Sequence, residues 1–197
     1  MRTAVVRAGL FLLLPVSLMG QSNRMPFPTP KVEAMGAYSL VHMEGRDMNG
    51  WNGSLAGNLN KNLGIVADVS AHYNTESSTG ILGTTESRLV FHTFLFGPQI
   101  SDRSNKWLTP FVHALFGGSR VNTRLTRTGN PATATSVSDS VTGFAMALGG
   151  GLDINANENV FFRLIQADYF LVRADQVKHE GARISAGILF RFGKRDN

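Results

Sequence analysis

Titratable side chains recur in this sequence on the polar side of segments that alternate between apolar and polar residues. Seven of them are Asp68, Arg88, His92, His113, Asp153, Arg183 and Arg191. Successive strand residues point to opposite faces, so these side chains would share the interior of a closed barrel. Charges in so confined a space must pair, because an isolated buried charge is costly. The pattern predicts a structural lumen network; a narrow ion path is the alternative, which the near balance of acids and bases argues against.

Arg163 and Asp168 would join this network only under one condition. Their odd spacing puts them on opposite faces of a regular strand. If both point inward, a β-bulge must lie between them.

Two histidines offer metal-binding or acid–base chemistry, but their surroundings supply no third group. His92 and His113 fall near the middle of neighbouring strands, which lie ~4.8 Å apart, so their rings are expected to meet. A metal would need a third ligand, and no compact motif provides one. The chain has no cysteine, which excludes disulfides and thiolate chemistry. We expect hydrogen-bonded lumen histidines, and no metal, cofactor or catalytic site.

The N-terminus has the pattern of a cleaved secretory signal, predicted over residues 1–20. Arg2 and Arg7 precede a short apolar run that ends at the small residue Gly20. A membrane anchor is the alternative, but the run is shorter than the ~20 residues of a spanning helix. Loss of the two arginines lowers the net charge from +5 to +3, too little to indicate nucleic-acid binding. The proline-rich residues 21–32 are expected to form a periplasmic lead-in.

The remaining sequence predicts an all-β chain that crosses a membrane. No segment after the signal is apolar for long enough to form a spanning helix, so an exported membrane chain would need a closed β-barrel. The alternation predicts eight strands, at 33–44, 51–60, 63–74, 87–99, 107–121, 141–154, 160–173 and 182–193. Long polar loops at 75–86 and 122–140 would lie on one side and short turns on the other, as in outer-membrane barrels.

The last strand shows why lipid is preferred to a soluble core. Ile184, Ile188 and Phe190 fall on one face, and Arg183 and Arg191 on the other. A lipocalin-type soluble barrel would turn the apolar face inward, whereas a membrane barrel turns it toward lipid. A soluble barrel has no need of aromatic residues at both strand ends. Here the candidates for two interfacial girdles are Trp51, Tyr73, Trp107 and Phe192.

The pattern resembles the small outer-membrane β-barrel family, the class of the outer-membrane protein A barrel. The segments that carry the resemblance are 51–57, 63–70, 167–169 and 183–193. The resemblance implies an eight-stranded antiparallel transmembrane β-barrel over 33–193 with a short tail at 194–197. It also implies contact with outer-membrane lipid, recognition of the aromatic closing strand by the barrel-insertion machinery, and a monomer.

The sequence specifies the fold of this protein more closely than its function. We expect a structural or surface-presenting protein with a filled lumen, and the alternative is a loop-based adhesin or ligand binder. A lower alternative is a lipid-modifying enzyme. Deacylases of this barrel type carry a His-x-Ser element, whereas this chain has His72-Tyr-Asn, His92-Thr-Phe and His113-Ala-Leu. We therefore do not expect an enzyme.

Overall fold

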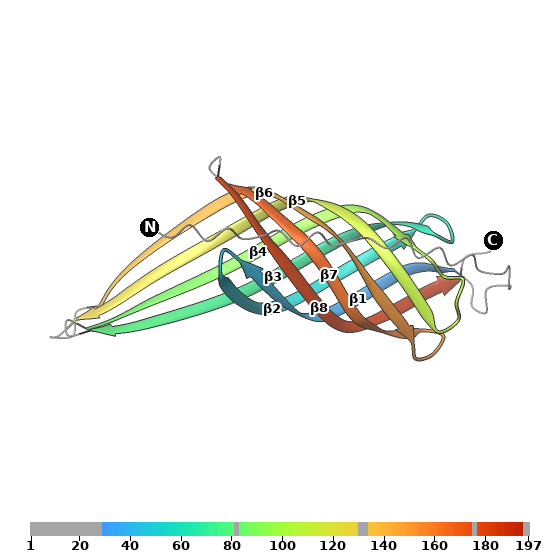
Figure 1. The fold of residues 1–197 in the computed structure, drawn as a ribbon, viewed down its shortest axis with the longest axis horizontal. Coiled ribbons are helices and arrows are strands. Elements are labelled where there is room, and N and C mark those ends of the chain that lie inside the picture. The colour runs from blue at the N-terminus through green and yellow to red at the C-terminus, as the bar shows by residue number, and fades with distance from the viewer. Residues whose placement is uncertain (1–28, 81–82, 130–133, 175–176, 195–197) are drawn as a thin grey trace, which may run out of the picture.

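The protein forms a closed barrel of eight antiparallel strands. The structure is a computed structural model that describes residues 29–80, 83–129, 134–174 and 177–194. Each strand pairs with its neighbours in the chain, and β1 pairs with β8 to close the ring (Figure 1). The strands are β1 (Pro30–Met43), β2 (Arg46–Asn58), β3 (Leu63–Gly80), β4 (Gly83–Ser101), β5 (Leu108–Gly129), β6 (Ala134–Asn155), β7 (Val160–Ala174) and β8 (Val177–Lys194). The predicted fold is confirmed.

The barrel turns apolar side chains outward and polar side chains inward. Phe94 and Phe96 are 63% and 66% exposed, whereas Asp68 and Arg183 are 1% and 0% exposed. A water-soluble protein would bury the first pair and expose the second. The outer wall therefore matches hydrocarbon, in which a closed ring also leaves no unpaired strand edge. No helix in the described ranges is long and apolar enough to cross a membrane.

Several strands have the faces that their alternation predicts. In β3, β6 and β8 the residues predicted to face the lumen are buried or partly buried. The sequence leaves the phase of β1 open. In the structure Tyr38 and Leu40 point outward, and Glu33 and Ser39 are buried. Along most of the wall, the polar side chains of each strand therefore face the lumen and the apolar side chains face outward.

A bulge in β7 brings both of its charged residues inside. The register of β7 against β8 shifts between Arg163 and Gln166. Leu164 and Ile165 both lie exposed on the outer wall, and Arg163 and Asp168 are both buried. The condition for these two charges to share the lumen is met.

The phase predicted for β4 is wrong. Arg88 and His92 were expected inside, but the buried residues of this strand include Phe91 and Thr93. By strand alternation His92 lies on the outer wall, where it pairs opposite Arg120. The prediction failed because both faces of β4 carry bulky apolar residues, so hydrophobicity does not distinguish lipid from lumen.

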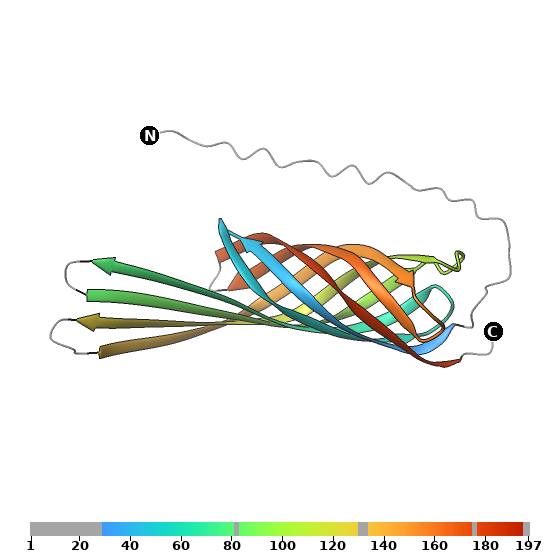
Figure 2. The same ribbon diagram turned by 90° about the horizontal axis from the view of Figure 1, so that it is seen from below.

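The long polar segments predicted as loops are mostly strand. β3 and β4 pair as far as Gly80 opposite Gly83, and β5 and β6 pair as far as Thr128 opposite Ala134. These strands extend well beyond the ends of the others at the end of the barrel opposite Pro30 and Lys194 (Figure 2). We call residues 75–80, 83–90, 122–129 and 134–141 the outer ribbon. Threonine and serine form favourable cross-strand pairs, which is why a composition typical of loops adopts strand structure here.

Three predicted boundaries also change. The turn expected at 45–50 consists of Glu44 and Gly45 alone, whose φ angles of 51° and 75° suit a two-residue hairpin. β1 begins at Pro30, opposite Lys194, and so includes the end of the expected lead-in and the start of the expected tail. Proline is tolerated as the first residue of a strand. The predicted signal at 1–20 lies outside the described residues.

The direction of the two faces can be tested with arginine substitutions. Ala147 is fully buried in the lumen, so Ala147→Arg should overfill it and add an unpaired charge, which prevents folding into lipid vesicles. Ile188→Arg should also destabilise the barrel, by up to about 4 kcal/mol according to depth in the bilayer. Heat-modifiable gel migration measures both. Ala156→Arg, in an exposed turn, is the matched control and should fold normally; normal folding of Ala147→Arg would contradict a packed lumen.

Candidate functional site

The centre of the lumen is organised around one fully buried arginine. Arg183 Nη1 donates to Asp68 Oδ1 at 2.9 Å, and Arg183 Nε donates to Asp168 Oδ2 at 2.8 Å. Asn52 Nδ2 donates to the same Asp68 carboxylate at 2.7 Å. The guanidinium lies 5.2 Å from the ring of Phe170. Residues from β2, β3, β7 and β8 are therefore joined across the barrel by one cation and two anions.

A second arginine continues this network toward the end of the barrel where β1 begins at Pro30 and β8 ends at Lys194. Arg163 binds Asp153 through Nε at 2.8 Å and Nη2 at 3.1 Å, and donates to Gln166 Oε1 at 2.8 Å. Gln166 Nε2 and His113 Nε2 both lie 2.8 Å from Asp168 oxygens, which accept from them. The bidentate arginine–carboxylate geometry is the stronger form of such a pair. The bulge in β7 thus serves to complete a continuous chain of hydrogen bonds.

A separate ionic cluster lies at the end of the lumen where β1 begins at Pro30 and β8 ends at Lys194. Glu33 accepts from Arg103 Nη2 at 2.9 Å and from Arg191 Nε at 2.5 Å. Arg103 also donates to the Lys61 carbonyl at 2.7 Å, and Arg191 lies 3.5 Å from the ring of Phe161. One carboxylate and two guanidinium groups are therefore buried together at this end.

Sequence reasoning missed two members of this cluster. Glu33 lies an even number of residues from the buried Ser39 and Val41 and so shares their inward face, but the phase of this strand could not be assigned from its sequence. Arg103 lies in the turn between β4 and β5, where strand periodicity gives no signal. A buried arginine contributed by a turn can be found only from the folded ring.

Small residues on β6 make room for the network. A Cβ atom at Gly149 would lie 2.2 Å from Asp168 Oδ1 and 2.2 Å from the Ala167 carbonyl oxygen. One at Gly151 would lie 2.8 Å from the Phe111 ring. The run of alanine and glycine on the inner face of β6 is therefore a packing requirement of the bulky side chains on β5 and β7.

An apolar plug fills the lumen on the other side of Arg183. Phe91 and Phe170 meet edge to face with centroids 6.0 Å apart. They pack in one cluster of buried residues that also includes Val41, Met48, Ala56, Val66, Leu95, Leu115, Ala145, Ala147 and Val172. Phe94 faces outward, whereas Val66 and Leu189 are buried. The ionic clusters and the plug together fill the lumen.

The structure places the sequence-predicted site residues in two groups. Asp68, His113, Asp153, Arg183 and Arg191 contribute to the lumen clusters, together with Arg163 and Asp168. Arg88 and His92 do not, and the expected contact between His92 and His113 is wrong because His113 pairs opposite Gln99 on β4. The girdle candidates Trp51, Tyr73, Trp107 and Phe192 are all exposed.

One serine–histidine pair has the distance of a nucleophile and its base. Ser39 Oγ lies 2.9 Å from His72 Nε2, and Ser185 donates to Ser39 at 2.9 Å. Both Ser39 and His72 are 0% exposed, and His72 Nδ1 has no hydrogen-bond partner among the described residues. A catalytic histidine needs an orienting acid and an accessible nucleophile, so this arrangement is suited to packing. Within the described ranges, no three His, Cys, Asp or Glu side chains are grouped as metal ligands.

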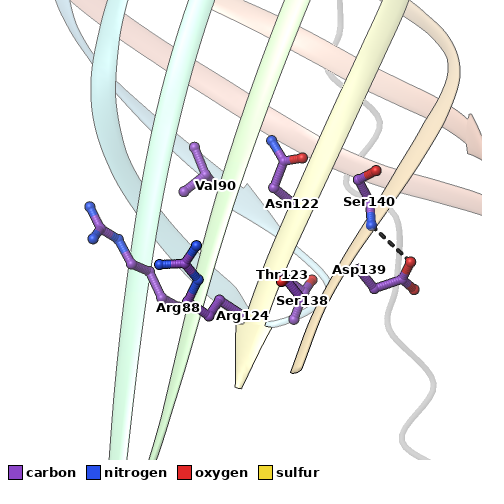
Figure 3. A pocket seen from close by; sticks show the side chains of 8 residues that line it. All are labelled: Arg88, Val90, Asn122, Thr123, Arg124, Ser138, Asp139 and Ser140. Atoms are coloured by element: carbon purple, nitrogen blue, oxygen red, sulfur yellow. Dashed lines mark hydrogen bonds between the residues drawn. The ribbon is translucent and has the colours of Figure 1, made fainter. Parts of the chain in front are cut away.

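A groove of about 510 Å³ lies on the outer ribbon (Figure 3). Arg88 and Arg124, cross-strand partners on β4 and β5, line one side, and Asn122 and Ser138 lie beside them. Asp139 also lines the groove and accepts a hydrogen bond from the Ser140 amide at 2.8 Å. Neither arginine forms an ion pair with a described residue. Like charges directly opposite one another are destabilising, so this pair is unfavourable without an anion.

Comparisons with known proteins agree on the architecture. A solved structure of Ail, the attachment invasion locus protein of Yersinia pestis, matches 83% of this chain and 99% of its own chain, at 20% identity and a TM-score of 0.54. The structure of Ail in complex with the heparin analogue sucrose octasulfate matches the same shares at 20% identity and a TM-score of 0.53. No protein-family model and no curated protein matches the sequence. The chain therefore has the fold of the small eight-stranded outer-membrane β-barrels.

Removal of the central cation should be strongly destabilising. Arg183→Met leaves the buried carboxylates of Asp68 and Asp168 without their shared guanidinium, which should cost about 3–5 kcal/mol in the free energy of unfolding. Urea unfolding in lipid vesicles measures the change. Arg173→Met, at an exposed position of β7, is the matched control and should change stability by less than about 0.5 kcal/mol.

A rescue experiment separates charge from packing. Adding Asp68→Asn and Asp168→Asn to Arg183→Met removes the unpaired charges and should recover a large part of the loss. If the triple variant is as unstable as Arg183→Met alone, the ion pairs are not the reason that Arg183 is needed.

Proposed function

We propose that this protein is exported with a cleaved signal and inserted in the outer membrane, where it presents its outer ribbon to the exterior. In this role the barrel is a rigid anchor in lipid, and the chain acts as a monomer. The aromatic closing strand, which includes Phe190 and Phe192, is the segment that the barrel-insertion machinery would recognise. The observation that carries the proposal is the projection of β3 to β6 beyond a barrel whose lumen is filled.

The division between a filled lumen and a projecting sheet favours presentation over transport. Arg183 and its two carboxylates span the lumen, and the apolar plug lies next to them. Among the described residues, β3 pairs with β2 only up to Tyr73 and β6 pairs with β7 only from Phe144, so the outer ribbon pairs with neither β2 nor β7. Segments that a rigid scaffold presents carry function in many proteins, and the outer ribbon is a polar sheet presented by a rigid barrel.

Planar-bilayer recording tests the closed lumen. The purified protein should give no stable conductance steps, because ions would have to pass the Phe91–Phe170 contact and the Arg183 cluster. Large reproducible steps from the folded barrel would contradict a purely structural and presenting role.

A second candidate function is binding of sulfated or phosphorylated glycans by the outer ribbon. Arg88 and Arg124, which form no ion pair with a described residue, favour it, because their groove places two guanidinium groups side by side (Figure 3). Guanidinium groups bind sulfate and phosphate oxygens through paired hydrogen bonds. The Ail structure solved with sucrose octasulfate shows that a barrel of this fold can be crystallised with a sulfated sugar bound.

Sucrose octasulfate is the probe for this function. Arg124→Gln should weaken its binding to the barrel in lipid nanodiscs by roughly tenfold, and the effect should shrink as salt is raised. Arg127→Gln removes the same charge from the same strand but from outside the groove, so it is the matched control. Equal losses in the two variants would indicate general electrostatic attraction and contradict a groove site.

A further inference from the structure

An apolar cavity opens at the mouth of the barrel, inside the ring and below the outer ribbon. We call it the mouth cavity. Its volume is about 330 Å³, and its lining comes from β1, β2, β4, β5, β6, β7 and β8. Met48, Phe91 and Val172 form its buried floor, Val121 is part of its wall, and Glu44 and His179 stand at its rim. It adjoins the Arg88–Arg124 groove, with which it shares Thr123 and Asp139, but neither arginine lines it.

The chemistry of the mouth cavity is unlike the rest of the lumen. It continues the apolar plug and is lined mainly by methionine, valine, leucine and phenylalanine, whereas the lumen around Arg183 and Glu33 holds ion pairs and hydrogen bonds. The interior of outer-membrane barrels is ordinarily polar. A concave apolar surface that remains open is characteristic of a ligand site, and methionine adapts its shape to different occupants.

The floor makes the cavity a dead end. Phe91 packs on Phe170 with ring centroids 6.0 Å apart, and the Phe170 ring in turn contacts the Arg183 guanidinium at 5.2 Å. A molecule that enters from the mouth therefore stops at the plug. Occupation of the cavity would be a binding event, with no continuous path to the other end of the barrel.

The rim is polar and holds one ion pair. His179 Nδ1 lies 2.5 Å from Glu44 Oε1, joining β8 to the turn between β1 and β2. Both side chains retain contact with solvent, with exposures of 30% and 58%. A molecule with an apolar body and a polar end could therefore bury the first against the floor and keep the second at the rim in water.

From this combination we propose that the mouth cavity binds a free single-chain amphiphile, such as a medium-chain fatty acid or alcohol, from the aqueous side. The hydrocarbon chain lies against Met48, Phe91 and Val172, and the head group stays among the polar rim residues. A cavity of about 330 Å³ is at the small end of ligand pockets, which suits one short chain and excludes a two-chain phospholipid. This binding site is independent of glycan binding by the outer ribbon.

Photochemical labelling in nanodiscs tests the proposal. The probe is a medium-chain fatty acid with a terminal diazirine, and labelled peptides are identified by mass spectrometry. We expect labelling at Met48 and Phe91 themselves, located within their peptides by fragmentation, and competition by an unlabelled medium-chain alcohol. Label confined to outer-wall positions such as Phe96 would show that the probe only partitions into the bilayer, which would overturn the proposal.

Filling the cavity provides the matched comparison. Val121→Phe projects a larger side chain into it and should lower labelling of the floor several-fold, whereas Val137→Phe, the same substitution on the exposed ribbon, should leave it unchanged. If Val121→Phe fails to fold, Ala174→Phe fills the cavity from β7. Unchanged floor labelling in a folded filling variant would overturn the proposal.

A second probe distinguishes the source of the chain. A phospholipid with the same diazirine on one acyl chain should label the outer wall and spare the floor. Floor labelling by this phospholipid equal to that by the fatty acid would overturn the assignment to a free single-chain ligand.

Discussion

The pairing of β1 with β8 is the constraint on which the rest of the structure depends. It runs from Pro30 opposite Lys194 to Met43 opposite Gly181 and converts an open sheet into a ring. In hydrocarbon every backbone donor and acceptor needs a partner, and only closure supplies one for the edge strands. Closure of eight strands also limits the interior to a width that side chains can fill. Every inward residue must therefore be compatible with those across the ring.

The lumen satisfies that requirement with three kinds of packing. Glu33 pairs with two arginines, Arg103 and Arg191. Arg183 joins carboxylates from opposite walls at the centre, and an apolar cluster packs beside it. Each buried charge has a partner of opposite sign, which offsets its desolvation. Arg183–Asp68 joins β8 to β3 and His113–Asp168 joins β5 to β7, so these two contacts connect the wall across the ring. The filled barrel is thus a stiff base for the outer ribbon and the mouth cavity.

The sequence predicted the ring, the strand number and most of the inside–outside pattern. It succeeded where one face is polar or small, as in β3, where Asp68 and Ser70 alternate with Ala67 and Val69. It failed in β4, because Phe91 packs in the lumen while Phe94 and Phe96 meet the outside, and periodicity alone treats the two faces alike. The reason is physical: an apolar plug makes part of this lumen as hydrophobic as the lipid face.

The candidate sites were less accessible to sequence reasoning. The lumen charges could be assigned to the interior, but their partners depend on which strands face each other across the ring. Arg88 and Arg124 lie in segments that resemble loops by composition, and they become neighbours only because those segments continue as paired strands. The mouth cavity is formed by seven strands at once, and no local motif encodes it.

The inside-out polarity of the barrel is the central claim, and β4 is the strand on which it is least obvious from sequence. Since the chain has no cysteine, single cysteines can be placed at Thr93, Phe94, Leu95 and Phe96 and labelled with a nitroxide. Collision rates with oxygen dissolved in the bilayer then report which positions face lipid. The structure predicts high rates at 94 and 96 and low rates at 93 and 95. The opposite alternation, or equal rates at all four positions, would contradict it.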